Sequence, residues 1–278
     1  MNNPFNKYST LLIVAFFSII SFSCKKNKGV EENNDDGGGF FESYRYELWK
    51  NLVDSGYNFD FVGRQKDYGT YAEYLGEEFD NDHEGQGGFE SEDVLDNIDD
   101  VLLAISNPDI VILSVGGNDL LDGGNPPSEP ISNIIQLVGK LQTHNSNITV
   151  FLEQIAPANN ATMTTALTTN INDFNSQIVL IADSLTTISS KIIALDMNSD
   201  FYESYLADDV HYNADGAKFV ADIYFAGIQG EYPANVPIKI LPLGDSRVEG
   251  NRPWKYLFTN YCFGWTNCYI NEQNTYLK

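Results

Sequence analysis

Residues 238–247, IKILPLGDSR, decide how the rest of the sequence is interpreted. Apolar residues alternate along this stretch as far as Gly244, and the next two residues, Asp245 and Ser246, bring a carboxylate and a hydroxyl. The pattern predicts a buried strand that delivers a serine to the carboxyl edge of a parallel sheet, where open α/β folds hold their sites. Such a strand usually begins a domain, but here it lies close to the C-terminus.

The composition describes a folded and strongly acidic protein. The chain has 278 residues, enough for one domain of good size plus appendages. A hydrophobic content of 42% allows a substantial core and excludes a disordered chain. The formal charge of −23, from 39 acidic and 16 basic residues, repels nucleic acid and anionic lipid. We therefore expect no nucleic-acid partner.

The N-terminal segment has the features of an export signal. Residues 1–23 combine Lys7 with a short apolar run and small residues, and they are predicted to be a signal peptide. Cys24 resembles the lipidated cysteine of bacterial lipoproteins; an ordinary secretory signal and an uncleaved anchor are the alternatives. Residues 24–40 are predicted to be a flexible tether. The protein is expected in the periplasm or on the cell surface of a Gram-negative bacterium, with the membrane reached only through the lipid.

The C-terminal tail, residues 251–278, mixes polar and aromatic residues without a clean period, so the sequence does not indicate its structure. It contains Cys262 and Cys268. In an exported compartment these two residues can form a disulfide, or they can stay as isolated thiols. Neither state bears on the chemistry.

Helical and strand patterns alternate along residues 41–250, which are predicted to be one domain. This alternation predicts an α/β fold with a parallel sheet and helices on both faces. Residues 64–89 are expected to be an irregular loop, and Ser91 is expected to cap the helix that follows. The expected helices are 41–53, 91–106, 131–143, 163–189 and 214–228, and the expected strands are 59–63, 109–115, 148–155, 192–197 and 238–243.

Four of the expected loops carry groups that acyl transfer requires. The hydroxyl of Ser246 is a weak nucleophile and needs a base within hydrogen-bond reach. His211 suits that role near neutral pH, and Asp208, three residues earlier, can fix its tautomer. An oxyanion needs preorganised donors, which the amide of Asn118 and the backbone at Gly88 can supply. The sequence therefore predicts a serine nucleophile, a histidine base and an oxyanion hole.

These residues resemble the four blocks of the SGNH (GDSL-type) hydrolases. Gly244-Asp245-Ser246 resembles the first block and Gly88 the glycine of the second. Gly116-Gly117-Asn118-Asp119 resembles the third block and Asp208-Asp209-Val210-His211 the last. Any one of these motifs alone is weak, but four on one α/β chain make a strong signal.

The resemblance implies a role for each matching residue. Ser246 would be the nucleophile, His211 the base and Asp208 the carboxylate that supports it. The resemblance further implies a flavodoxin-like three-layer sandwich and a mechanism without metal or other cofactor. The implied oxyanion donors are Ser246, Gly88 and Asn118, and the implied supporting residues are Asp245, Asp119 and Gly117.

A longer segment indicates a branch of the family. Residues 79–89, FDNDHEGQGGF, are similar to a D-x-D-H-E-G segment of carbohydrate esterases related to acetylxylan esterases. This resemblance implies an exported esterase that deacetylates carbohydrate, with an acetylated polysaccharide or a small ester as its substrate. The alternatives are a non-catalytic surface lipoprotein that binds glycans and a lipid-directed esterase or thioesterase. The sequence does not indicate the oligomeric state.

Several single features have a second interpretation. The carboxylates of residues 80–84 partly resemble a calcium loop, although its twelfth position is Ser91 instead of glutamate. His83 is interpreted as a structural hydrogen-bonding residue. Arg247 either contacts substrate or pairs with carboxylates. The aromatic residues form either a sugar platform or a loop core; they are Tyr68, Tyr71, Tyr74 and Phe89.

The displaced first block has two explanations. In the usual family order the strand with G-D-S comes first and an amphipathic helix follows, whereas here the helix 41–53 comes first. In one explanation the chain is circularly permuted, and residues 238–247 lie between the strands 59–63 and 109–115. In the other, residues 238–250 begin a truncated second domain. We expect Ser246 to meet His211 in the fold.

Overall fold

The computed structural model describes residues 40–67, 69, 71–121 and 126–252. The predicted signal peptide (1–23), the predicted lipidation site Cys24, nearly all of the predicted tether, and Tyr68 lie outside the described residues, as do Cys262 and Cys268. In the described part of the chain, none of the helices combines the length and the apolar character that crossing a bilayer requires.

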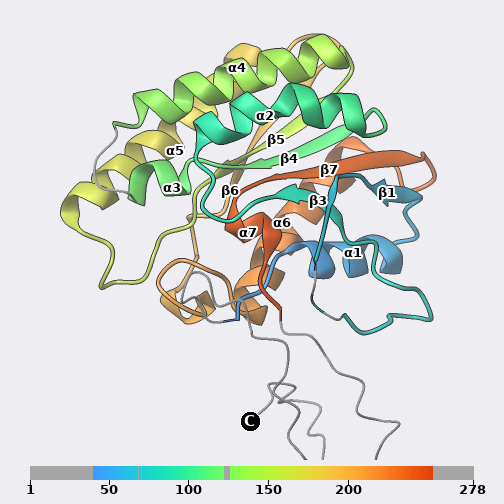
Figure 1. The fold of residues 1–278 in the computed structure, drawn as a ribbon, viewed down its shortest axis with the longest axis horizontal. Coiled ribbons are helices and arrows are strands. Elements are labelled where there is room, and N and C mark those ends of the chain that lie inside the picture. The colour runs from blue at the N-terminus through green and yellow to red at the C-terminus, as the bar shows by residue number, and fades with distance from the viewer. Residues whose placement is uncertain (1–39, 68, 70, 122–125, 253–278) are drawn as a thin grey trace, which may run out of the picture. The chain divides into compact units, whose positions relative to one another are not determined.

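The described residues form one seven-stranded sheet with the order β2-β3-β7-β4-β5-β6, and β1 also pairs with β7 (Figure 1). Every neighbouring pair is parallel except β2 and β3, which are antiparallel. The strands are β1 (Phe59–Phe61), β2 (Gln65–Lys66), β3 (Asp82–Gly85), β4 (Ile110–Ser114), β5 (Thr149–Gln154), β6 (Lys191–Asp196) and β7 (Ile238–Gly244).

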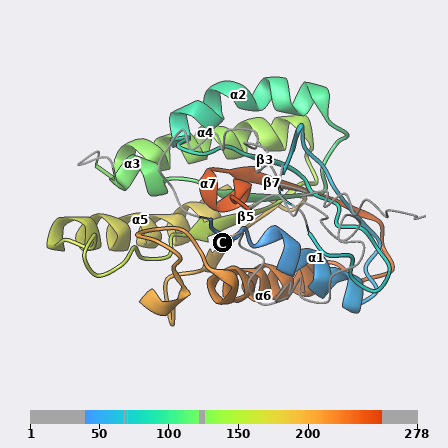
Figure 2. The same ribbon diagram turned by 60° about the horizontal axis from the view of Figure 1, so that its bottom comes forward.

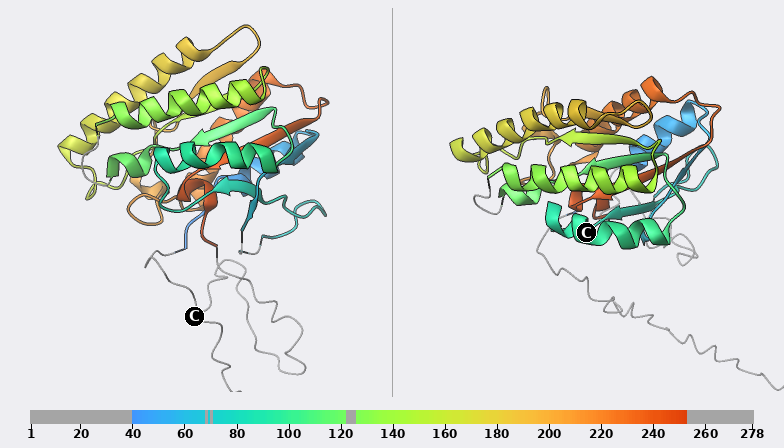
Figure 3. Two further views of the ribbon diagram at one scale, coloured as in Figure 1. Left: turned by 45° about the horizontal axis from the view of Figure 1, so that its top comes forward. Right: turned by 90° about the horizontal axis from the view of Figure 1, so that it is seen from above.

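Helices cover both faces of this sheet. Helices α2, α4 and α5 lie side by side on one face, and α1 and α6 pack together on the other (Figures 2 and 3). The fold is therefore α/β with a mostly parallel central sheet flanked by helices, which confirms the predicted class. The helices are α1 (Arg45–Asp54), α2 (Ser91–Ala104), α3 (Gly117–Leu121), α4 (Ser128–His144), α5 (Thr165–Leu185), α6 (Ala214–Glu231) and α7 (Ser246–Glu249), with a 3₁₀ turn at Glu203–Tyr205.

Residues 64–89 differ from the expected irregular loop, because they contain β2 and β3. Strand β3 has the sequence DHEG, which lacks an alternating apolar pattern, and its buried His83 and Glu84 are polar. The helix cap is also one residue away from the expected position. Glu90, not Ser91, is the N-cap of α2, and it forms a reciprocal capping box with Asp93.

Strand β7 lies inside the sheet, between β4 on one side and β1 with β3 on the other. Its side chains alternate between the two layers. Ile238 and Ile240 pack in the core under α1 and α6, while Leu241 and Leu243 pack in the core under α2, α4 and α5. All four are at most 2% exposed. The strand therefore contributes to both halves of the hydrophobic core.

Proline is unusual inside a sheet because it cannot donate a ladder hydrogen bond. The backbone of the even-numbered residues of β7 faces β1 and β3, since Ile240 O accepts from Val62 N at 2.9 Å and Gly244 O from Gln86 N at 3.0 Å. Pro242 consequently faces the point where β1 ends and β3 begins. The missing N–H thus falls at a gap between two partner strands.

Candidate active site

Ser246 is presented at the carboxyl end of β7 by a sharp turn into α7. Gly244 has a φ of +156°, and a Cβ on it would lie 1.9 Å from Ser114 O, so only glycine fits there. Asp245 is the N-cap of α7, and its side chain accepts a hydrogen bond from Arg247 N at 2.9 Å. Ser246 is the first residue of the helix. The turn therefore places the hydroxyl at the sheet edge.

His211 and Asp208 meet this serine from the turn that follows β6. The Nε2 atom of His211 lies 2.8 Å from Ser246 Oγ, and its Nδ1 atom lies 2.8 Å from Asp208 Oδ2. With Nδ1–H donated to the carboxylate, Nε2 is free to accept the serine proton. The side chains of His211 and Asp208 are 20% and 34% exposed. The structure thus brings together the three residues that the motifs indicated.

Hydrogen bonds keep Asp208 ionised. Partial burial alone would raise the pKa of its carboxyl, but the N–H groups of Val210 and His211 and the imidazole of His211 outweigh that effect and lower the pKa. The two backbone donors lie 2.9 and 2.8 Å from Oδ1. This local turn explains why a separation of three residues places both groups on one side. Asp208 is therefore an anion wherever the imidazole can act as a base.

The loop at residues 85–88 packs against α7. The Oε2 atom of Glu249 accepts a hydrogen bond from Gly87 N at 2.6 Å, and a Cβ on Gly87 would lie 4.0 Å from the Cβ of Ser246. Gly88 has a φ of +77°, and a Cβ there would meet no atom within 4 Å. A side chain at Gly88 would therefore point into open space, and it is the preceding residue, Gly87, that approaches Ser246.

Asn118 ties the third motif to the same loop. It lies near the start of α3, and its Nδ2 atom donates to Phe89 O at 2.9 Å. An amide nitrogen has two hydrogens, so a second donor is available after this bond. Gly117, the residue before it, approaches Asp245, whose Oδ2 would lie 3.6 Å from a Cβ at this glycine.

Two buried carboxylates lie behind the site. Asp119 is 3% exposed and accepts a hydrogen bond from Ser91 N at 3.0 Å, which joins α3 to α2. Asp245 is 4% exposed, and burial raises its pKa to about 7, although the charge and the N–H of Arg247 act in the opposite direction. Neither carboxylate contacts His211 in the described hydrogen bonds. Both hold backbone segments that carry other site residues.

Arg247 is buried and directed into the protein. Its Nε donates to Val210 O at 3.0 Å and its Nη1 to Ala156 O at 3.3 Å. Val210 precedes His211, so the Arg247 side chain links α7, which carries Ser246, to the turn that carries His211. The sequence left open contact with substrate or pairing with carboxylates, whereas the hydrogen bonds of the Arg247 side chain go to two carbonyls and to the hydroxyl of Tyr212.

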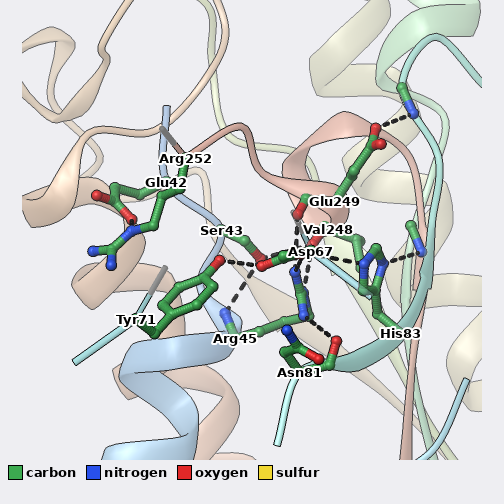
Figure 4. A network of polar contacts seen from close by, with 12 residues as sticks. Glu42, Ser43, Arg45, Asp67, Tyr71, Asn81, His83, Val248, Glu249 and Arg252 are labelled. Atoms are coloured by element: carbon green, nitrogen blue, oxygen red, sulfur yellow. Dashed lines mark hydrogen bonds and ion pairs between the residues drawn. The ribbon is translucent and has the colours of Figure 1, made fainter. Parts of the chain in front are cut away.

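The sequence interpretation missed Arg45 and Glu249. Arg45 is fully buried, and its guanidinium donates to Val248 O at 2.7 Å and Glu249 O at 2.9 Å, the last carbonyls of α7 (Figure 4). Asp67 neutralises its charge. Helix α7 is thus held by the Asp245 side chain at its start and by the Arg45 side chain at its end. The signal in the sequence is weak, since Arg45 is one of several charged residues within the aromatic stretch 40–50.

The features with a second interpretation have structural partners. Asp80 accepts from Phe61 N at 2.7 Å, Asp82 pairs with Lys66, and Glu84 pairs with Arg64, so these carboxylates face different partners. The described residues contain no cluster of three or more potential metal ligands.

His83 and two of the aromatic residues belong to the packing of this loop. His83 accepts a hydrogen bond from Gly85 N at 3.0 Å, and burial and the charge of Arg45 lower its pKa. Tyr71 bonds to Asp67 (Figure 4), and the hydroxyl of Tyr74 bonds to Asp54. These tyrosines pack with α1, as a loop core.

Comparison with protein families and solved structures gives an independent result. A model described as the GDSL-like Lipase/Acylhydrolase family matches residues 53–219. The matched range contains Gly88, Asn118, Asp208 and His211 but ends before Ser246. No curated protein matches the chain.

Three solved structures are among the most similar. A family 3 carbohydrate esterase of Clostridium thermocellum is 28% identical, with a TM-score of 0.55, over 68% of this chain and 87% of that chain. A carbohydrate esterase family 3 protein from Talaromyces cellulolyticus is 24% identical, with a TM-score of 0.61, over 68% and 90%. An acetyl esterase mutant solved with acetate ion gives the same four values. The latter two bear on the fold alone.

Proposed function

Because the chain belongs to the GDSL-like lipase/acylhydrolase family, which hydrolyses carboxylic esters, we propose that it is a serine esterase with Ser246, His211 and Asp208 as its catalytic triad. One observation carries the proposal. The line of hydrogen bonds from Asp208 through His211 to Ser246 is unbroken, with 2.8 Å at each step.

The geometry permits a complete acyl-transfer cycle. Ser246 Oγ attacks the ester carbonyl carbon while its proton passes to His211 Nε2, and Asp208 stabilises the imidazolium that forms. Collapse of the tetrahedral intermediate expels the alcohol, which takes the proton from Nε2. Water then gives a proton to Nε2 and attacks the acyl-serine, and the second collapse returns that proton to Ser246 and releases the acid.

Three groups are proposed to bind the oxyanion. Ser246 lies in the first turn of α7, where a helix leaves its N–H groups without intrahelical partners. Gly88 presents its backbone to open space, and Asn118 retains a second amide hydrogen. Such donors act strongly because they are held in place before the charge develops. Asp245, Asp119 and Gly117 are proposed to support the segments that carry them.

The substrate class rests on two supports. Residues 79–89 resemble a segment of acetylxylan-esterase-like enzymes, and in this fold they form β3 and the loop that packs on α7. A family 3 carbohydrate esterase is similar at 28% identity. We propose an acetyl ester of a carbohydrate as the substrate. The signal-peptide features of residues 1–23 and Cys24 support the proposal that the enzyme is exported and lipid-anchored.

We also infer that the order of elements arose by circular permutation of the family fold. Phe41 and Asn251 form a two-way backbone bridge, with N–O distances of 3.0 Å in both directions. The segment before α1 therefore runs beside the segment after α7. In the family order a short connection joins these two segments, so cutting it and joining the ends elsewhere would produce this chain.

Release of acetate from acetylated xylan by the purified mature chain tests the proposed function. We expect release that is proportional to enzyme concentration, and faster turnover of p-nitrophenyl acetate than of p-nitrophenyl octanoate. Acetate is measured by a coupled enzymatic assay, with xylan that has been chemically deacetylated as the control. Turnover of the octanoate ester alone would contradict the substrate class and favour a lipid-directed esterase. Absence of turnover on every ester would contradict the enzyme assignment.

Replacing Asp208 by asparagine tests the tautomer argument. Asparagine keeps an oxygen that can accept from Val210 N and His211 N, so we expect the fold to persist. Its amide can donate to Nδ1, which favours the wrong imidazole tautomer, and we expect kcat to fall by about 10⁴-fold. The measurement is kcat for p-nitrophenyl acetate, with Asp209→Asn as the neighbouring control. A loss below tenfold would show that Asp208 does not orient the base.

A further inference from the structure

A phenyl ring covers one face of the His211 imidazole. The rings of Phe41 and His211 are stacked, with centroids 3.8 Å apart and an interplanar angle of 14°. The two imidazole nitrogens bond within the ring plane to Asp208 and Ser246. Phe41 therefore contacts the base in the direction that these hydrogen bonds do not control.

Phe41 is itself held firmly. It is 7% exposed, and its backbone N–H and C=O both pair with Asn251. The next residue, Glu42, donates its N–H to Tyr212 O at 2.8 Å, and Ser43 Oγ donates to Val248 O at 2.7 Å. The segment that carries the phenyl ring is thus joined to the residue after His211 and to the helix of Ser246.

Two physical effects follow from the stacking. A phenyl face at van der Waals contact hinders tilting of the imidazole out of the plane of its two hydrogen bonds. It also presents the negative side of an aromatic quadrupole to the ring that becomes positively charged in the transition state, within the distance at which cation–π attraction operates. Both effects act when the base accepts the serine proton.

We propose that Phe41 is a positioning residue for His211: its aromatic face keeps the imidazole in the plane of the triad and stabilises the imidazolium. The inference rests on the proposed esterase function. An aliphatic side chain of similar size can fill the space but has no quadrupole. An aromatic side chain is therefore required at this position.

The test compares Phe41→Leu with Phe41→Tyr. An interaction that strengthens in the transition state changes kcat more than KM. We expect Phe41→Leu to lower kcat for p-nitrophenyl acetate about 5- to 30-fold with little change in KM, and Phe41→Tyr to retain most of the activity. Phe225→Leu, the same change at a half-buried phenylalanine on α6, serves as the control, and we expect it to leave kcat unchanged.

A spectroscopic measurement gives a second readout that does not depend on turnover. Protons above a phenyl face are shielded by its ring current, so the His211 ring protons should resonate upfield of those of His144, which is exposed at the end of α4. Phe41→Leu should remove this shift and Phe41→Tyr should keep it. The wild-type shift decides the stacking even if the leucine variant does not fold.

The outcomes separate the two proposals. Equal kcat in the leucine and tyrosine variants, whether both are retained or both are lost, would overturn the role of Phe41, as would His211 resonances without an upfield shift. Failure of the esterase function would appear differently, as equal turnover in the wild-type chain and Ser246→Ala. In that case the stacking would still be measurable by the resonances, but its catalytic role would be overturned.

Discussion

Ser246→Ala is expected to lower kcat for p-nitrophenyl acetate by about 10⁶-fold, the scale seen when a serine hydrolase loses its nucleophile. The variant removes the one atom that bonds to the acyl group, and His211 Nε2 then has no hydroxyl to deprotonate. The residual rate comes from the oxyanion donors and substrate binding. Because Ser246 is half-buried and the change removes a single atom, the fold should persist.

The control for this variant is Ser132→Ala, which changes an exposed serine on α4 in the same way. We expect unchanged turnover in the control and matching thermal melts in both variants. Undiminished turnover in Ser246→Ala would exclude Ser246 as the nucleophile. Loss of the cooperative melt in that variant would instead show that the serine supports the fold.

Leu241→Asp is expected to unfold the domain. Leu241 is fully buried at the centre of β7. Burial of the four aliphatic side chains of this strand, Ile238, Ile240, Leu241 and Leu243, contributes about 1.5–3 kcal/mol each to stability, or about 6–12 kcal/mol together. The net stability of a domain is about 5–15 kcal/mol. Loss of one such contact and burial of a carboxylate without a partner should remove most of that margin.

The measurement is the urea unfolding midpoint, and Lys239→Asn is the control on the same strand, where the side chain is half-exposed. We expect the control to unfold near the wild-type midpoint. If residues 238–250 belonged to a separate and truncated domain, Leu241→Asp would leave the main transition in place. An unchanged midpoint in Leu241→Asp would therefore contradict the placement of β7 between β1 and β4.

The larger elements could be predicted because local periodicity and core position agree in them. β4 is a continuous apolar run and is buried at every position, and α4 and α6 begin and end within a few residues of the expected bounds. The site motifs could be located for a similar reason. Residues 116–118 and 244–246 directly follow predicted strands, the turn of Asp208 and His211 comes in the loop after β6, and the carboxyl ends of parallel strands meet at one edge of the sheet.

Contacts between distant segments could not be predicted in this way. One face of the His211 ring is covered by Phe41, which lies far earlier in the sequence. Nothing in the sequence around either residue indicates this contact. Arg45 has the sequence context of an ordinary helix residue, and only the fold brings its guanidinium to the carbonyls of Val248 and Glu249 in α7. β3 has no apolar period, because polar side chains occupy its buried positions. Their burial is possible because partners elsewhere in the fold bind them, such as Arg64 for Glu84. These features depend on tertiary partners alone.

In the proposed active site, Ser246 at the end of β7 is activated by His211 from the loop between β6 and α6, within one domain. Labelling with a fluorophosphonate, followed by mass spectrometry of the digested protein, tests it most directly, because such reagents modify activated serines. We expect one adduct, on Ser246, and a rate of labelling that falls by several orders of magnitude in His211→Ala. An adduct on another residue, or equal labelling rates in the two proteins, would contradict it.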